Sequence, residues 1–173
     1  MTLSELILSE YNRVHADLVA DYVIQNPGLL PEMMELVFKL EEPLSRRAAW
    51  SLRILSQKKV SIVEPFVPEI IRRIRVVNNV PILKLILAVL VETEITDEHH
   101  GELLQFTSEV LIDSNSSIAC LIYSMDIFYK LSLKEPDLLN ELRLMLEQII
   151  PYGSPGVKNK CGRLIRKITK QIG

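Results

Sequence analysis

The chain contains the sequence Pro43-Leu44-Ser45-Arg46-Arg47-Ala48-Ala49-Trp50-Ser51-Leu52, and a pattern that starts there returns along the polypeptide. Apolar or small residues stand three or four positions apart, which is the spacing of one helix face. These positions are Leu44, Ala48, Ser51, Leu52 and Leu55. Small side chains on such a face allow close approach of a neighbouring helix. The segment therefore predicts a helix that packs tightly against its partners.

Three later segments carry apolar or small residues at the equivalent positions. They are Ile82, Ile86, Val89, Leu90 and Thr93; Ser117, Leu121, Ser124, Met125 and Phe128; and Val157, Cys161, Leu164, Ile165 and Ile168. The separation of about 35 to 40 residues is typical of repeats built from helix pairs. Short turns rich in proline, asparagine or glycine divide the intervening sequence into further helices. We therefore expect a single domain over residues 1–173. It comprises an N-terminal helix over 3–24 and repeats at about 28–59, 65–94, 96–134 and 136–172.

Composition supports an all-α fold with a core. Hydrophobic residues make up 48% of the chain and charged residues 24%, which disfavours disorder. Six glycines are few for the turns of a β-sandwich or barrel. The longest apolar run, residues 82–91, contains Lys84 and is about half a membrane span. The N-terminus lacks the features of a signal peptide, so we expect a soluble, cytoplasmic protein with no membrane contact.

The segment 43–52 resembles the second helix of a HEAT repeat, with an apolar residue, arginine, small residues and then leucine. The segment 155–161 looks like the same element with lysine in place of arginine, and the resemblance covers roughly residues 28–172. It implies an all-α, right-handed α-α superhelix of about four antiparallel helix pairs plus an N-terminal capping helix. It also implies that the second helices line a concave face, and that the protein acts by binding.

Charge is unevenly distributed along the chain. The segments 43–59 and 148–173 contain lysine and arginine but no acid, whereas 96–113 contains acids but no lysine or arginine. Positions at i, i+4 and i+7 of each second helix share a face beside the core positions. They predict a concave stripe of Arg46, Trp50, Arg53, Lys84, Tyr123, Asp126, Arg163 and Arg166. Two interpretations stay open: a binding surface, or a solvated face with Trp50 packed under the N-terminal helix.

No residue pattern indicates catalysis, a metal or a cofactor. His15 lies on an amphipathic helix, and the adjacent His99 and His100 point in different directions, so they cannot easily grip one metal ion. Cys120 and Cys161 are expected to be buried, inert thiols. The sequence 154–159 is loosely similar to a loop of the fumarase and adenylosuccinate lyase superfamily. Only a serine, a lysine and an asparagine match, with the wrong spacing, so a lyase is disfavoured.

These features favour a non-catalytic scaffold whose concave face binds a protein or peptide partner. The alternative is a nucleic-acid-binding domain related to the HEAT-like DNA alkylation-repair glycosylases. Trp50, Asp126 and Arg163 have residue types that such a site uses, although a pI near 6.0 argues against it. Self-association through the terminal repeats is a further possibility. The sequence leaves the partner and the oligomeric state open.

Overall fold

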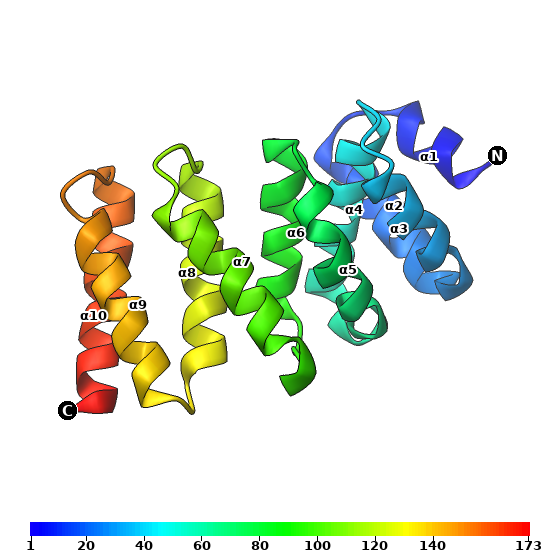
Figure 1. Cartoon of the computed structure of the whole chain (residues 1–173). Helices are drawn as coiled ribbons and strands as arrows, with labels where there is room; N and C mark the ends of the chain where they lie inside the picture. Colours follow the sequence, from blue (N-terminus) through cyan, green and yellow to red (C-terminus); the bar gives the residue numbers. More distant parts are fainter. The chain divides into compact units, whose positions relative to one another are not determined.

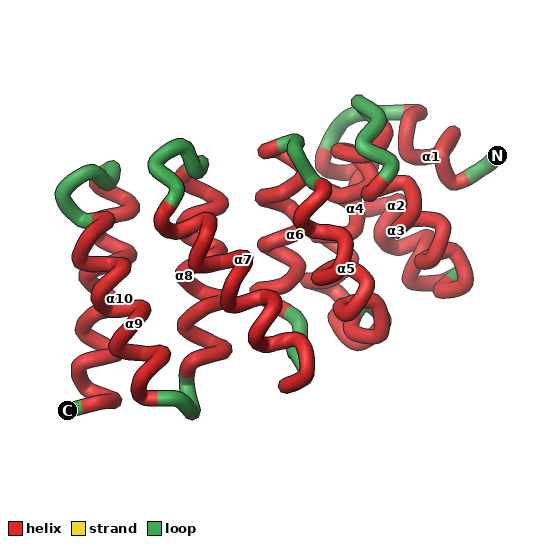
Figure 2. The backbone as a smooth tube through the Cα atoms, viewed as in Figure 1, coloured by secondary structure: helices red, strands yellow, loops and turns green.

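The computed structural model describes all residues from Met1 to Gly173 and contains ten α-helices, short 3₁₀ turns and no strand (Figures 1 and 2). The expected all-α class is confirmed. The helices are α1 Leu3–Ser9, α2 Arg13–Gln25, α3 Leu30–Phe38, α4 Leu44–Lys58, α5 Val67–Arg73, α6 Val80–Glu92, α7 His100–Ile112, α8 Ile118–Ser132, α9 Pro136–Ile149 and α10 Pro155–Ile172. Contacts divide the chain into two compact units, Met1–Ile95 and Thr96–Gly173, called here the first and second unit.

The N-terminal region holds two helices where a single helix over 3–24 was expected. A capping box starts α1: the Thr2 hydroxyl accepts a hydrogen bond from the Glu5 amide, and the Glu5 carboxylate accepts one from the Thr2 amide. Asn12 then starts α2, because its side-chain oxygen accepts a 2.8 Å hydrogen bond from the His15 amide. The chain is extended at Glu10 and at Asn12, and this ends one helix before the next begins.

The break also changes which face of this region is buried. Tyr11 and Val14, which fit the core pattern of one continuous helix, are 55% and 78% exposed. The buried side chains of α2 are those of His15, Ala16, Val19, Ala20 and Val23. A three- and four-residue spacing carried through both helices therefore does not identify the buried face of α2, because the non-helical turn resets the rotation of the chain.

In the first unit, α4 is the central helix and packs against α2, α3 and α6. Its recurring positions Ala48, Ser51, Leu52 and Leu55 are buried, and Leu44 at the start of the helix is half-buried. The equivalent residues on α6 and at its C-cap are all buried, and they are Ile82, Ile86, Val89, Leu90 and Thr93. Ser45 joins α3 to α4: its hydroxyl donates a 2.6 Å hydrogen bond to the Leu36 carbonyl and accepts one from the Glu41 amide.

The second unit consists of the antiparallel pairs α7–α8 and α9–α10, and α8 also contacts both helices of the last pair. Its core contains Leu111, Met125, Phe128, Leu139, Leu142, Leu146, Val157, Cys161, Leu164 and Ile168. Leu121 and Ile165 are half-buried at the edge of this core. Ser117 lies at the N-cap of α8, where its hydroxyl accepts a hydrogen bond from the Cys120 amide. The first of the five recurring positions therefore marks a helix start there.

Candidate interaction surfaces

The eight stripe residues fall into two groups of four, one in each unit. Arg46, Trp50 and Arg53 lie on α4, and Lys84 lies on α6. Tyr123 and Asp126 lie on α8, and Arg163 and Arg166 lie on α10.

On α4, Arg46 is held by two neighbours. Its Nε donates a 3.1 Å hydrogen bond to the Glu42 carboxylate, and its Nη1 donates a 3.0 Å hydrogen bond to the Tyr11 hydroxyl. The hydrogen bond to Glu42 raises the pKa of the Arg46 guanidinium further above its ordinary value. Arg53 donates a 3.3 Å hydrogen bond to the Glu92 carboxylate at the end of α6. Both arginines thus already have acidic partners within the first unit.

Trp50 is half-buried and packs edge-on against Tyr11, with ring centroids 5.7 Å apart and an interplanar angle of 69°. The Arg47 guanidinium lies 4.8 Å from the centroid of the same tyrosine ring. Tyr11 belongs to the turn between α1 and α2, so these contacts attach the N-terminal segment to α4. They correspond to the second interpretation of Trp50, in which the indole packs under the N-terminal region. Lys84 is exposed and has no ion pair.

In the second unit, three contacts join α8 to α10. The Lys160 ammonium pairs with the Asp126 carboxylate. The Tyr129 hydroxyl donates a 3.0 Å hydrogen bond to the Gln171 side chain. The Lys167 ammonium lies 5.9 Å from the centroid of the Tyr129 ring. These contacts fix the register of the two helices and place Asp126 and Tyr129 beside α10. Tyr123 lies one turn before Asp126 on α8 and is half-buried.

Five cations lie on one face of α10, and we call them the α10 basic face. They are Lys160, Arg163, Arg166, Lys167 and Lys170. Two of them, Lys160 and Lys167, make the contacts with α8. Positions three, four and seven apart lie on one helix face. Only Lys160 has a carboxylate partner, and the other four side chains are exposed. Exposed guanidinium and ammonium groups in this arrangement can bind carboxylates or phosphates, arginine in bidentate geometry.

The histidines and cysteines make local contacts. The buried His15 donates from Nε2 to the Leu6 carbonyl at 2.7 Å and so joins α1 to α2. His99 lies 3.4 Å from the Glu98 carboxylate. No group of three or more His, Cys, Asp or Glu side chains is arranged to hold a metal ion. Cys120 and Cys161 form no disulfide and are buried, and burial raises the pKa of the Cys161 thiol.

The cations of α4 and α10 are visible in the sequence, whereas the partners that other helices bring to them are not. Tyr11 fits the apolar spacing of a single helix over 3–24, yet its ring is exposed and contacts Arg46, Arg47 and Trp50. The one available signal was Asn12, a residue type that often starts helices. A helix start at this position places Tyr11 in a turn.

Antiparallel helix pairs whose second helices share recurring core positions define a helical-repeat protein. The family model of the HEAT repeat domain matches residues 4–172. The chain therefore belongs to the HEAT repeat domain family. Searches of curated proteins and of solved structures found no match. None of its helices combines the length and the apolar character that crossing a membrane requires.

Proposed function

We propose that the chain is a non-catalytic scaffold and that its α10 basic face, with Tyr123 and Asp126 beside it, binds an acidic segment of a protein partner. One observation carries this proposal: four exposed cations on a single helix have no carboxylate partner. HEAT repeats in general present extended binding surfaces and have no chemistry of their own. Tyr129 adds aromatic area beside the cations, because its ring centroid lies 5.9 Å from the Lys167 ammonium, and such area is common at protein interfaces.

Charge distribution favours a protein partner over a nucleic acid. A nucleic-acid surface normally carries a basic patch that follows the phosphate backbone. In the first unit, Arg46 and Arg53 pair with Glu42 and Glu92, so those cations are already partly neutralised. In the second unit, Asp126 places a negative charge beside the α10 basic face. The net charge of the whole chain is -2.

Arg46, Trp50 and Arg53 are proposed to serve the fold of the first unit rather than a ligand. Their contacts with Tyr11, Glu42 and Glu92 already use the groups that a ligand would engage. Lys84 is the exposed member of that group. Among these four residues, Lys84 is therefore the one that could attract an acidic partner, and its contribution would be weak.

The proposal can be tested with two defined probes in one fluorescence anisotropy assay. The first is a fluorescein-labelled, glutamate-rich peptide with two aromatic residues, and the second is a labelled DNA duplex of similar charge. The double variant Arg163→Glu, Arg166→Glu should weaken peptide binding about tenfold or more, because it reverses the sign of two central contacts. Both side chains are exposed, so helicity by circular dichroism should be unchanged.

The matched control is Lys134→Glu, Lys158→Glu, which makes the same charge change away from the α10 basic face. Both lysines are exposed and have no ion pair. This control should change peptide affinity by less than about threefold, the size expected for long-range charge alone. Equal loss in the two double variants would contradict the proposal. Tighter binding of the duplex than of the peptide, with a steep salt dependence, would favour the nucleic-acid alternative.

A further inference from the structure

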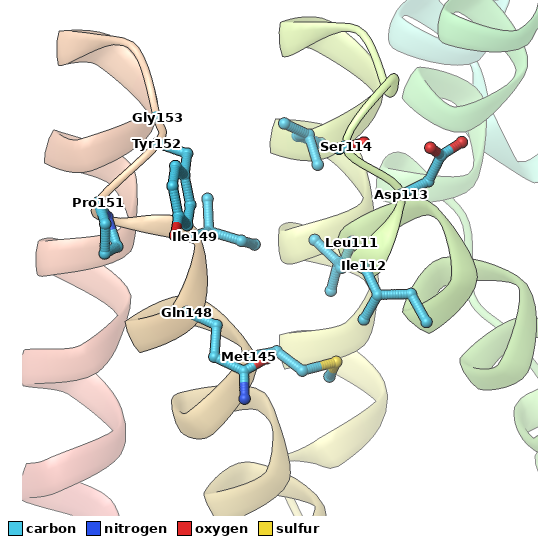
Figure 3. A pocket seen from close by; sticks show the side chains of 11 residues that line it. Leu111, Ile112, Asp113, Ser114, Met145, Gln148, Ile149, Pro151, Tyr152 and Gly153 are labelled. Carbon is cyan, nitrogen blue, oxygen red and sulfur yellow. The ribbon is translucent and has the colours of Figure 1, made fainter.

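A groove of about 620 Å³ opens on the second unit, between the turn that joins α7 to α8 and the turn that joins α9 to α10 (Figure 3). None of its lining residues belongs to the α10 basic face. Gly153 keeps the second turn close to α10, because a Cβ at this position would lie 2.9 Å from Val157 Cγ1. The groove is therefore bounded on one side by a turn with little room to move inward.

The walls of the groove are largely apolar. Met145 and Ile149 extend from α9 toward Leu111 and Ile112 at the end of α7 (Figure 3). Ile112 is 68% exposed, and Tyr152 at the opposite rim is 92% exposed. Large apolar side chains that line a hollow and remain open to water are typical of surfaces that a ligand covers.

The charge around the groove is negative. Asp113 is the only charged residue in its lining, and its Oδ1 accepts a 2.9 Å hydrogen bond from the Asn115 amide within the same turn. The segment 96–113, which ends at this rim, contains five acids and neither lysine nor arginine. On α9, the single basic residue Arg143 lies 3.7 Å from the Glu147 carboxylate and is thereby compensated. An occupant of this groove would meet apolar walls and an acidic rim.

We infer that this groove is a docking site for a basic amphipathic segment of a partner protein. One large apolar side chain of the segment enters between Ile112 and Tyr152, and a lysine or arginine beside it pairs with Asp113. Amphipathic helices bind hydrophobic grooves in this manner, with apolar anchors at helical spacing. The site differs from the α10 basic face in position and in the sign of its charge, so it does not depend on the proposed function.

The experiment uses the full chain and a synthetic peptide of about 15 residues, with leucine at helical anchor positions and lysine elsewhere. Methyl NMR of the labelled protein locates the peptide, because Leu111, Ile112, Met145 and Ile149 all carry methyl groups in the groove. We expect these methyl signals to shift as the peptide is added. A charge-reversed peptide with glutamate in place of lysine should leave them unmoved, even where it binds the α10 basic face.

Three substitutions give the expected energetics by fluorescence anisotropy. Ile112→Ser and Tyr152→Ser should each lower affinity for the lysine peptide roughly tenfold, since each removes an apolar contact. Asp113→Asn should lower it about threefold to tenfold, because it removes the charge but keeps the oxygen that accepts the Asn115 hydrogen bond. The matched control is Val76→Ser in the first unit, where the side chain is 62% exposed. It should leave the affinity unchanged.

The proposal is overturned if the lysine peptide leaves the groove methyl signals unmoved, or if the glutamate peptide shifts them equally. It is also overturned if light scattering shows a dimer that Ile112→Ser dissociates, because the occupant is then a second copy of the chain. If charge reversal on α10 does not weaken binding of the acidic peptide, the expected NMR and light-scattering results for the groove stay the same. The two proposals can therefore fail separately.

Discussion

Tyr11 shows how one exposed side chain can hold two parts of a unit together. Its ring packs against Trp50 and lies under the Arg46 and Arg47 guanidinium groups, at 5.4 Å and 4.8 Å from the ring centroid. Arg47 also donates a 3.0 Å hydrogen bond to the Leu8 carbonyl. The region between α1 and α2 is therefore attached to α4 by ring and cation contacts.

From this geometry, Tyr11→Ala should lower the free energy of unfolding by about 1–2 kcal/mol, the sum expected for an aromatic pair and a cation–π contact. Tyr11→Phe keeps the ring and loses only the hydroxyl that accepts from Arg46, so its cost should stay below about 1 kcal/mol. Urea denaturation of the wild type and both variants measures these values. Because Trp50 is the only tryptophan, its emission should also shift in Tyr11→Ala. Equal costs for the two variants would contradict this role of the ring.

Cys161 is a small side chain at a tightly packed position of the core. It is fully buried at one of the recurring positions, where the core of the second unit meets α10. Burial raises the pKa of its thiol, and a raised pKa leaves less of the reactive thiolate at neutral pH. Cys120 is also buried.

We therefore expect both thiols to react slowly with a thiol reagent in the native protein and rapidly in denaturant. Mass spectrometry after timed labelling gives the two rates for each cysteine. Cys161→Phe should in addition lower the free energy of unfolding by about 1–3 kcal/mol through overpacking. Cys161→Ala serves as its control and should cost less. Rapid labelling of Cys161 in the folded protein would show that this position is more open than its packing indicates.

At the scale of helices, polar contacts join α2 to α4 in a way that depends on pH. The Asp17 carboxylate accepts a 2.7 Å hydrogen bond from Arg13 Nε, and Lys58 Nζ lies 3.0 Å from it. The hydrogen bond from Arg13, followed by that from Lys58, lowers the pKa of Asp17 below its ordinary value. Lys58 also pairs with Asp21 at 2.8 Å, and that hydrogen bond raises the pKa of Lys58.

The sign of the pH effect follows from these shifts. A carboxyl group with a lower pKa in the folded state stabilises the fold above its unfolded pKa and loses this contribution as the pH falls. Wild type should therefore be more stable than Asp17→Asn near neutral pH, and the difference should shrink below about pH 4. Denaturation curves of both proteins across this range provide the measurement. Glu141→Gln, at an exposed residue without an ion pair, should show no comparable trend. A difference that persists unchanged into acid would refute the ionic origin.

The helices also show how much of this fold the sequence could predict. From α3 onward the helices fall in pairs inside the segments 28–59, 65–94, 96–134 and 136–172, because proline, asparagine or serine marks most of their starts. Asn79, Ser117 and Ser154 each accept a hydrogen bond from the amide three residues later. The break before α2 was missed because apolar residues continue across it with a spacing that still fits a helix.

The interaction surfaces were less predictable, for a physical reason. Helical spacing shows which residues of one helix share a face, but it does not show which residues another helix brings to them. Arg163 and Arg166 lie three residues apart on α10, and both side chains are exposed. Helical spacing could not reveal that Glu92 reaches Arg53 from another helix, or that Lys160 reaches Asp126. The apolar groove was missed because its two sides come from separate turns, which no local pattern connects.

At the scale of the whole molecule, basic and acidic side chains are concentrated on different helices. In the second unit, α10 contains only basic charges, whereas α7 contains acids without lysine or arginine. The net charge of -2 conceals this separation, because it is the sum over all the lysine, arginine, aspartate and glutamate residues of the chain. A scaffold of this kind can hold an acidic and a basic ligand at once, provided that the two sites share no residues. The α10 basic face and the groove satisfy that condition.

Simultaneous binding should therefore be close to independent. The Arg163→Glu, Arg166→Glu variant should keep its affinity for the lysine peptide within about threefold, and Ile112→Ser should do the same for the acidic peptide. In the triple variant, the loss of binding free energy for each peptide should equal the sum of the losses in the separate variants within about 0.5 kcal/mol. This is expected for separated sites without shared partners. Calorimetric titration of each peptide, alone and with the other bound, measures this. Strong coupling between the titrations would mean that the two ligands compete for one surface, because independent sites leave each affinity unchanged.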